Sequence, residues 1–161
     1  MQSLEHTLPA RAHSRNPLWA EKEKAFLSRN PACALCGVED SVVAHHIIPV
    51  PYCLALGRAD LELDERNLLT LCHSRAGNSC DDHHLYVGHL GDYHSFNLTV
   101  REDVQGRFKG SRKARLWFSV ERINSLQETL AAFPHLASMS DAQRGALRRR
   151  IDELFPLVGG N

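Results

Sequence analysis

The sequence predicts a small α+β protein whose core is stabilised by bound metal. An apolar run over residues 41–48 has the composition of a buried strand, and amphipathic stretches elsewhere have helical spacing. Cys33 and Cys36 are separated by two residues, a spacing typical of metal thiolates. The chain contains 10 histidines, and most of them lie between His45 and His94. Metal-binding side chains at this density are too many for an ordinary apolar core.

Length and charge restrict the class of protein. A chain of 161 residues has the size of one domain with a modest appendage. Lysine and arginine total 19, as do aspartate and glutamate, which argues against a generally basic surface but allows a local positive patch. No apolar run is long enough to cross a bilayer, and residues 1–15 lack the apolar segment of a secretory signal. We therefore expect a cytoplasmic protein whose five cysteines are reduced.

The first regular element that we expect is a helix over residues 17–28. Asn16 is a suitable N-cap, and Pro17 occupies the favoured first helical position. Trp19 and Phe26 recur at near-helical spacing, so both are expected to face the core.

A turn, a strand and a loop are expected next. Gly37 can adopt the positive φ that a tight turn after Cys33 requires. Residues 41–48 form the strand, whereas residues 49–63 are a loop with a weak helical tendency, interrupted by prolines. Residues 68–71 are either a short strand or the start of a helix.

The second half of the chain is predicted to be mostly helical. Acidic residues suit the start of a helix over residues 81–90. Residues 116–133 and 141–155 are amphipathic, and Ser140 or Asp141 can cap the second of these helices. We expect the two helices to pack as a hairpin on the core, or to form a partner surface.

Cys33 and Cys36 are interpreted as half of a structural zinc site. A tetrahedral site needs two more ligands, and these usually come from a second turn of the chain. The best candidates are Cys72 and Cys80, although seven residues separate them; His83 or His73 could replace Cys80. Two alternatives stay open, namely unrelated buried cysteines and a thiol redox motif.

A second site is centred on the adjacent pair His45 and His46. Neighbouring side chains on a strand point to opposite faces, so the pair serves two environments or lies where the strand bends. Phosphodiester hydrolysis needs a base for the attacking water, a cation to neutralise charge, and a group that orients the base. A histidine pair, a later Asn67 and further histidines on a helix offer these three parts in order.

The ordered motifs resemble the HNH endonuclease family over roughly residues 16–97. These motifs are Cys33-x-x-Cys36, His45-His46-Ile-Ile-Pro49, Asn67-Leu-Leu-Thr-Leu-Cys72, and His84 followed five residues later by His89. The resemblance implies a ββα-metal (His-Me finger) core with structural zinc, a two-stranded hairpin and a helix that hold one catalytic ion.

The resemblance also implies a role for each matching residue. His46 would be the general base, and Asn67 would orient it through the amide oxygen. His45 and His84 would bind the catalytic ion, with His89 as a third ligand. An i,i+5 pair does not align on a regular α-helix, so His89 requires a distortion of the helix near Gly88.

This chain departs from the common HNH pattern between Cys80 and His84, where Asp81, Asp82 and His83 intervene. The departure leaves open whether Cys80 or His83 completes the zinc site. It also leaves open whether His83 or His84 reaches the catalytic ion.

The expected function is metal-dependent hydrolysis of DNA phosphodiester bonds, by nicking or double-strand cleavage. The catalytic ion would be Mg²⁺, Mn²⁺, Ni²⁺ or Zn²⁺, and a ligand set of histidines favours transition metals. Salt-sensitive contacts to the DNA backbone are expected from the basic residues that follow the site. These are Arg107, Lys109, Arg112 and Lys113. The alternative function is a non-catalytic zinc-binding module that holds nucleic acid or protein.

These expectations divide the chain into four parts. Residues 1–15 are a disordered or extended N-terminus, and residues 16–99 are the nuclease domain. Residues 100–115 are a basic linker, and residues 116–161 are a C-terminal helical extension.

Overall fold

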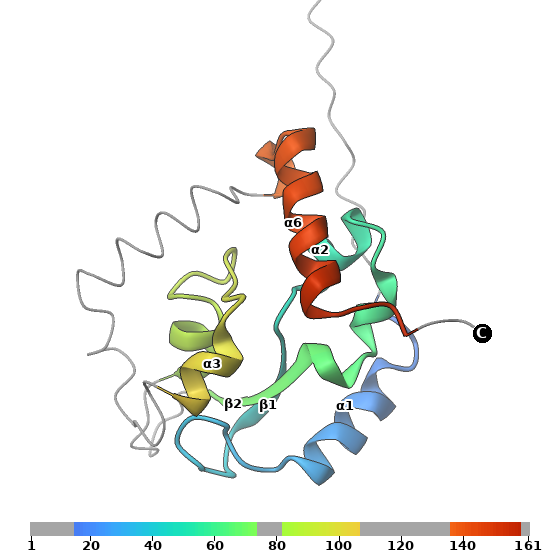
Figure 1. Cartoon of the computed structure of the whole chain (residues 1–161). Coiled ribbons are helices and arrows are strands. Elements are labelled where there is room, and N and C mark those ends of the chain that lie inside the picture. Colours follow the sequence, from blue (N-terminus) through green and yellow to red (C-terminus); the bar gives the residue numbers. More distant parts are fainter. Residues whose placement is uncertain (1–14, 74–81, 107–135, 159–161) are drawn as a thin grey trace, which may run out of the picture.

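The structure is a computed structural model that describes residues 15–73, 82–106 and 136–158 (Figure 1). Two antiparallel strands form its sheet, β1 over Val42–His46 and β2 over Leu68–Cys72. Several helices surround this hairpin, so the α+β class is confirmed. None of the helices in the described residues is long and apolar enough to cross a membrane.

The strands consist mostly of apolar residues, and Val42, Val43 and Thr70 are β-branched, which favours an extended backbone. Every residue of β2 is buried, and the last three residues of β1 are buried as well. The register pairs Val42 with Cys72 and His46 with Leu68. A cysteine therefore lies at one end of the hairpin and a histidine at the other.

Helix α1 spans Trp19–Arg29 and contacts β1. Trp19 and Phe26 are buried, as expected, and pack with Leu68 and Ala44 of the hairpin. The predicted start at Pro17 is two residues early. Asn16 does not cap the helix itself: its side-chain oxygen accepts a hydrogen bond from the backbone N–H of Leu18 in the preceding turn (3.0 Å).

The loop expected over residues 49–63 is more ordered than the sequence indicates. Helix α2 covers Val50–Ala55, and the short 3₁₀ helices η1 and η2 cover Ala59–Glu62 and Glu65–Asn67. Pro51 is tolerated because it lies in the first turn of α2, where its missing N–H breaks no helical hydrogen bond. Gly57, two residues after the end of α2, has a positive φ of 69°.

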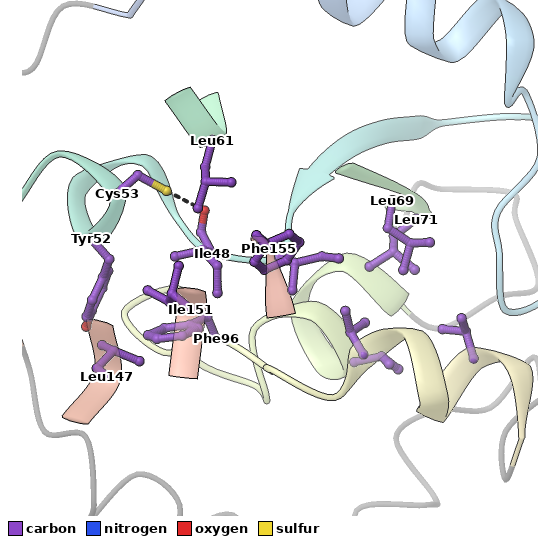
Figure 2. Packing of buried hydrophobic residues seen from close by; sticks show 14 of the residues in the cluster. Ile48, Tyr52, Cys53, Leu61, Leu69, Leu71, Phe96, Leu147, Ile151 and Phe155 are labelled. Carbon is purple, nitrogen blue, oxygen red and sulfur yellow. Dashed lines mark hydrogen bonds between the residues drawn. The ribbon is translucent and has the colours of Figure 1, made fainter. Parts of the chain in front are cut away.

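The C-terminal helix α6 spans Asp141–Leu154, close to the predicted bounds. Ser140 and Gln143 form a reciprocal capping box at its start. Leu147 and Ile151 lie one turn apart and are fully buried in the main core (Figure 2). Phe155, just beyond the helix, is buried in the same cluster.

Arg58 joins α6 to the loop between α2 and η1. Its side chain is fully buried, and its guanidinium donates to Asp60 (2.8 Å), to Asp152 of α6 (2.7 Å) and to the carbonyl oxygen of Phe155 (2.9 Å). Because a buried guanidinium needs partners on all sides, this contact specifies where α6 docks.

The remaining expectations concern the segments on either side of the predicted nuclease domain. The short helix α3 covers Val100–Gln105, where the sequence indicated a linker. The predicted helix over residues 116–133 lies outside the described residues, as do residues 1–14. The short 3₁₀ helix η4, Leu136–Ser138, leads into α6.

Candidate metal centres and catalytic pocket

Three cysteines and one histidine converge at one end of the hairpin. The ligand atoms of Cys33, Cys36, Cys72 and His83 all lie within 4.8 Å of one another. Cys36 Sγ is 3.8 Å from Cys72 Sγ, and His83 Nδ1 is 3.2 Å from Cys72 Sγ. Zinc with Zn–S bonds of about 2.3 Å in a tetrahedron places two sulfur atoms about 3.8 Å apart. The cluster therefore has the dimensions of a Cys₃His structural metal site.

The backbone around Cys33 holds the first two thiols in place. The N–H of Gly37 donates to the carbonyl of Cys33 (2.8 Å), and Gly37 has the positive φ of 77° expected for this turn. The N–H of Ala34 donates to the carbonyl of Thr70 (2.9 Å), which ties the turn to β2. Cys72 is the last residue of that strand, so the sheet register aligns it with the turn.

The thiols of Cys33 and Cys72 shift each other's pKa in opposite directions. A hydrogen bond with Cys72 lowers the pKa of the Cys33 thiol to about 3, and the contact raises the pKa of Cys72. Cys80 lies outside the described residues, and within them His83 supplies the fourth potential ligand atom. Cys53 is fully buried away from the cluster, where burial raises the pKa of its thiol to about 12.

Three histidines form a second cluster at the other end of β1. The ring centroids of His45, His84 and His89 are 4.8 to 5.2 Å apart, and the rings meet edge to face. One ligand nitrogen from each lies within 4.8 Å of the others. Within the described residues the structure thus places His83 with the cysteines and His84 with the histidines, whereas Cys80, the other candidate for the zinc site, lies outside them.

A single π-helical turn, η3 over His84–Gly88, brings His89 into this cluster. The N–H of His89 donates to the carbonyl of His84 (3.1 Å), five residues earlier, so the turn is wider than in an α-helix. This is the distortion that the i,i+5 spacing required. Of the helix predicted over residues 81–90, the described residues form this π-helical turn, and the helical hydrogen bonds end at His89.

Gly88 lets the π-helical turn approach His45 closely. A Cβ atom at residue 88 would lie 2.9 Å from Cε1 of the His45 ring and 3.1 Å from both ring nitrogens. Real side chains essentially never make such short contacts, so a glycine is required here by the imidazole that packs against it.

The buried ring nitrogens of this cluster fit a bound cation. Within the described part of the chain, His45 Nε2 and His84 Nδ1 are buried and have no hydrogen-bond partner. His89 Nδ1 pairs with the carbonyl of Ser95 (2.8 Å), so its Nε2 carries the free lone pair. Because unpaired buried nitrogens are costly and imidazole suits divalent transition metals, the donor set matches a metal centre.

All three imidazoles are held neutral at physiological pH. Burial lowers the pKa of His45, His84 and His89, and the neighbouring imidazoles lower the first two further. For His84 the pKa falls to about 3. Neutral imidazole is the form that binds metal, so the lowered pKa values favour the form that a metal would require.

His46 lies beside this cluster in a different environment. Its ring packs on Trp19 with centroids 4.4 Å apart, and its Nε2 is 2.9 Å from the carbonyl oxygen of Glu62. Since a carbonyl only accepts, Nε2 carries the proton and Nδ1 keeps its lone pair. Burial lowers the pKa of His46, so the neutral base predominates near pH 7.

Asn67 does not contact His46 in the way that the resemblance to the HNH family implied. Its amide oxygen accepts from the N–H of Ile48 (2.8 Å), and its amide nitrogen donates to the carbonyls of Ile48 (3.0 Å) and Leu61 (3.1 Å). The direct orienting contact that we expected is therefore wrong. Asn67 instead connects the segment after β1, at Ile48, with the 3₁₀ helix η1, at Leu61. The next residue of η1, Glu62, provides the carbonyl oxygen that is hydrogen-bonded to His46.

The histidines open into one pocket of about 440 Å³. His45, His46, His84 and His89 all line it, and so do Arg15 and Glu23. The Arg15 guanidinium is 4.7 Å from the centre of the Trp19 ring, on the helix that supports His46. The sequence did not single out Arg15 or Glu23, because only the docking of α1 brings them here.

His84 also belongs to a third group, with His73 and Asp82, whose ligand atoms lie within 4.8 Å of one another. Asp82 accepts from the N–H of Leu85 (2.8 Å) and pairs with His73 Nδ1 (3.3 Å). Asp82 thus acts at the start of the π-helical turn, as its position in the sequence predicted.

The expected DNA-contacting residues Arg107, Lys109, Arg112 and Lys113 lie outside the described residues. Arg101, which precedes them, donates to the carbonyls of Arg66 (2.7 Å) and Leu68 (2.9 Å). It therefore fastens α3 to the start of β2.

Comparisons of this chain with protein-family models, with curated proteins and with solved structures find no match.

Proposed function

We propose that this protein is a metal-dependent endonuclease of the HNH type that hydrolyses DNA phosphodiester bonds. In this proposal the β1–β2 hairpin and the π-helical turn are its ββα-metal core. One observation carries the proposal: a buried neutral imidazole with a free Nδ1, His46, lines the same pocket as three histidines with converging nitrogens. A base beside a cation site is what hydrolysis of a phosphodiester requires.

In the proposed reaction His46 Nδ1 accepts a proton from the water that attacks phosphorus. The bond from phosphorus to the 3′-oxygen then breaks, and that oxygen leaves with the electron pair. The Glu62 carbonyl keeps the His46 ring oriented, and Trp19 limits its rotation. Arg15 supplies a fixed positive charge for the phosphate oxygens.

His45, His84 and His89 would hold the catalytic ion. When bound, a divalent ion stabilises negative charge on the phosphate and on the departing oxygen. Mg²⁺, Mn²⁺, Ni²⁺ and Zn²⁺ are the candidates, and the all-nitrogen ligand set favours a transition metal. In this proposal, zinc at Cys33, Cys36, Cys72 and His83 is structural and takes no part in the reaction.

The test is cleavage of supercoiled plasmid by the wild type and by His46→Ala in the presence of each candidate metal. We expect nicked or linear products from the wild type and a loss of about a hundredfold or more for His46→Ala, typical of losing a general base. The zinc content of the variant should stay unchanged, and the variant should still unfold in one cooperative transition, although loss of the buried His46 ring lowers its stability. Leu18→Ala is a control, because this exposed residue lies beside Trp19 outside the pocket.

The alternative is a non-catalytic zinc-binding module, which the Cys₃His cluster would equally suit. Under that alternative no metal supports cleavage by either protein, while zinc remains bound. Equal cleavage by the wild type and His46→Ala would remove the proposed base and refute the mechanism.

A further inference from the structure

A second pocket adjoins the candidate catalytic pocket. Its volume is about 430 Å³, within the range of roughly 300–1,000 Å³ that ligand pockets occupy. Pro49 and Pro51 line both pockets, so the two share a wall. These prolines therefore place the two pockets next to each other.

Tyr93 lies at the junction of the two pockets. It lines the second pocket, and its ring centroid is 5.6 Å from that of His84 and 5.0 Å from that of His89. Tyr93 is 52% exposed, although its ring packs against the partly buried His84 and His89. Its exposed surface can stack on a flat ring.

The remaining walls suit a planar aromatic ligand with polar edges. Tyr52 is buried and rigid, because it packs on Phe96 with centroids 4.6 Å apart (Figure 2). Arg144 supplies cationic N–H groups, and two of its nitrogens donate to the carbonyls of Leu136 and Met139. An apolar pocket with a few polar groups at fixed positions is the usual form of a small-ring site.

We propose that this second pocket takes the nucleobase of a nucleotide next to the phosphodiester that is cut, and that this base must be unpaired. The inference rests on the proposed nuclease function, which places the phosphate beside His84 and His89. A base stacked in a duplex cannot enter a side pocket without being unpaired, so the enzyme prefers single-stranded, gapped or bulged substrates. Every nucleobase has a flat ring that can stack on Tyr93, so we expect no strong preference for one base over another.

Binding is tested first, in His46→Ala protein, so that cleavage does not interfere. The probe is a single-stranded oligonucleotide that contains 2-aminopurine, whose fluorescence is quenched when it stacks on an aromatic ring. We expect quenching in the parent protein, loss of quenching with Tyr93→Ala, and retention with Tyr93→Phe. Equal quenching with and without the Tyr93 ring overturns the inference.

Cleavage is tested second, in protein with His46 intact. An abasic position is moved through the nucleotides that flank the cut. We expect one abasic position to lower kcat/KM about fivefold to a hundredfold, the effect of losing one stacked base. Tyr93→Ala should cause a similar loss on the intact strand and no further loss on that abasic strand.

The outcomes separate this inference from the nuclease proposal. Quenching that depends on Tyr93 without any cleavage supports the base pocket and refutes the nuclease function. Cleavage that is equally reduced by Tyr93→Ala on intact and abasic strands refutes the base pocket, since Tyr93 would then act only through the histidines. Wild-type cleavage of paired duplex as fast as of the gapped substrate also refutes it.

Discussion

Gly88→Ala tests whether the close packing of the π-helical turn on His45 sets the geometry of the histidine cluster. The added Cβ would lie 2.9 Å from Cε1 of the His45 ring, whereas carbon atoms in contact are normally about 3.5–4.0 Å apart. Either the ring or the turn must therefore move by about 0.6 Å or more. The His45 ring is 1% exposed and belongs to the histidine cluster, so a shift of the ring or of the turn changes the spacing of the cluster nitrogens.

The expected cost has two parts. Overpacking of a buried site destabilises the fold by about 1–3 kcal/mol. A displacement of this size at a reacting centre lowers the cleavage rate by about tenfold to a hundredfold. Equilibrium unfolding in urea measures the first part. The loss of cleavage rate is measured with supercoiled plasmid. Titration with the metal that binds at the histidine cluster measures the effect on metal affinity.

Gly145→Ala is the matched control. Gly145 lies inside α6, and the nearest atom to its added Cβ is the side-chain nitrogen of Arg149 at 3.5 Å, an ordinary contact. Alanine should stabilise this helix by about 0.5–1 kcal/mol without affecting cleavage. If Gly88→Ala binds metal at the histidine cluster and cuts DNA as well as Gly145→Ala does, the reasoning about the His45 contact is wrong.

Three further predictions concern the zinc cluster, pH and the docking of α6. Cys72→Ser should lower the zinc content measured by mass spectrometry of the intact protein below one ion per chain and lower the unfolding temperature, because one of four ligands is lost. The unfolding free energy should fall as pH drops from about 6.5 toward 4. His45 and His84 have a lowered pKa when folded, so the unfolded chain binds more protons in that window; urea titrations at several pH values measure the slope. Arg58→Ala should destabilise the protein by about 2–5 kcal/mol, the cost of emptying a fully buried site, and an unchanged urea midpoint would contradict this.

The elements that were predicted well are those with a strong local signal. Helix α6 has both an apolar stripe and a capping box, and its observed bounds differ from the predicted ones by one residue. Strand β1 has an apolar run flanked by turn residues. The order within residues 49–63 was missed because α2 is one and a half turns long, too short for its periodicity to be distinguished from a loop.

The candidate ligands were identified by residue type, whereas their grouping required the structure. Cys33 and Cys36 are recognisable from spacing alone. The choice of His83 for the cysteines and His84 for the histidines depends on the direction in which adjacent side chains leave the turn, which the sequence does not state. The i,i+5 spacing of His84 and His89 did indicate a distorted helix, and a π-helical turn provides it.

The role of Asn67 shows where residue-by-residue inference fails. The comparison of motifs identified the position but implied a contact with His46, and the observed partners are backbone groups of Ile48 and Leu61. Backbone carbonyls, such as that of Glu62, have no signature in the sequence because every residue carries one.

The sequence by itself determined the α+β class, the metal-binding residue types and the approximate bounds of the main helices. Those properties follow from composition, spacing and periodicity, which are local. Only the tertiary structure decided which histidine joins which cluster, how the π-helical turn meets His45 through Gly88, and that Arg15 and Tyr93 lie beside the histidine cluster. Each of these depends on the packing of segments far apart in the chain, and packing is set by the shapes of all the buried side chains together.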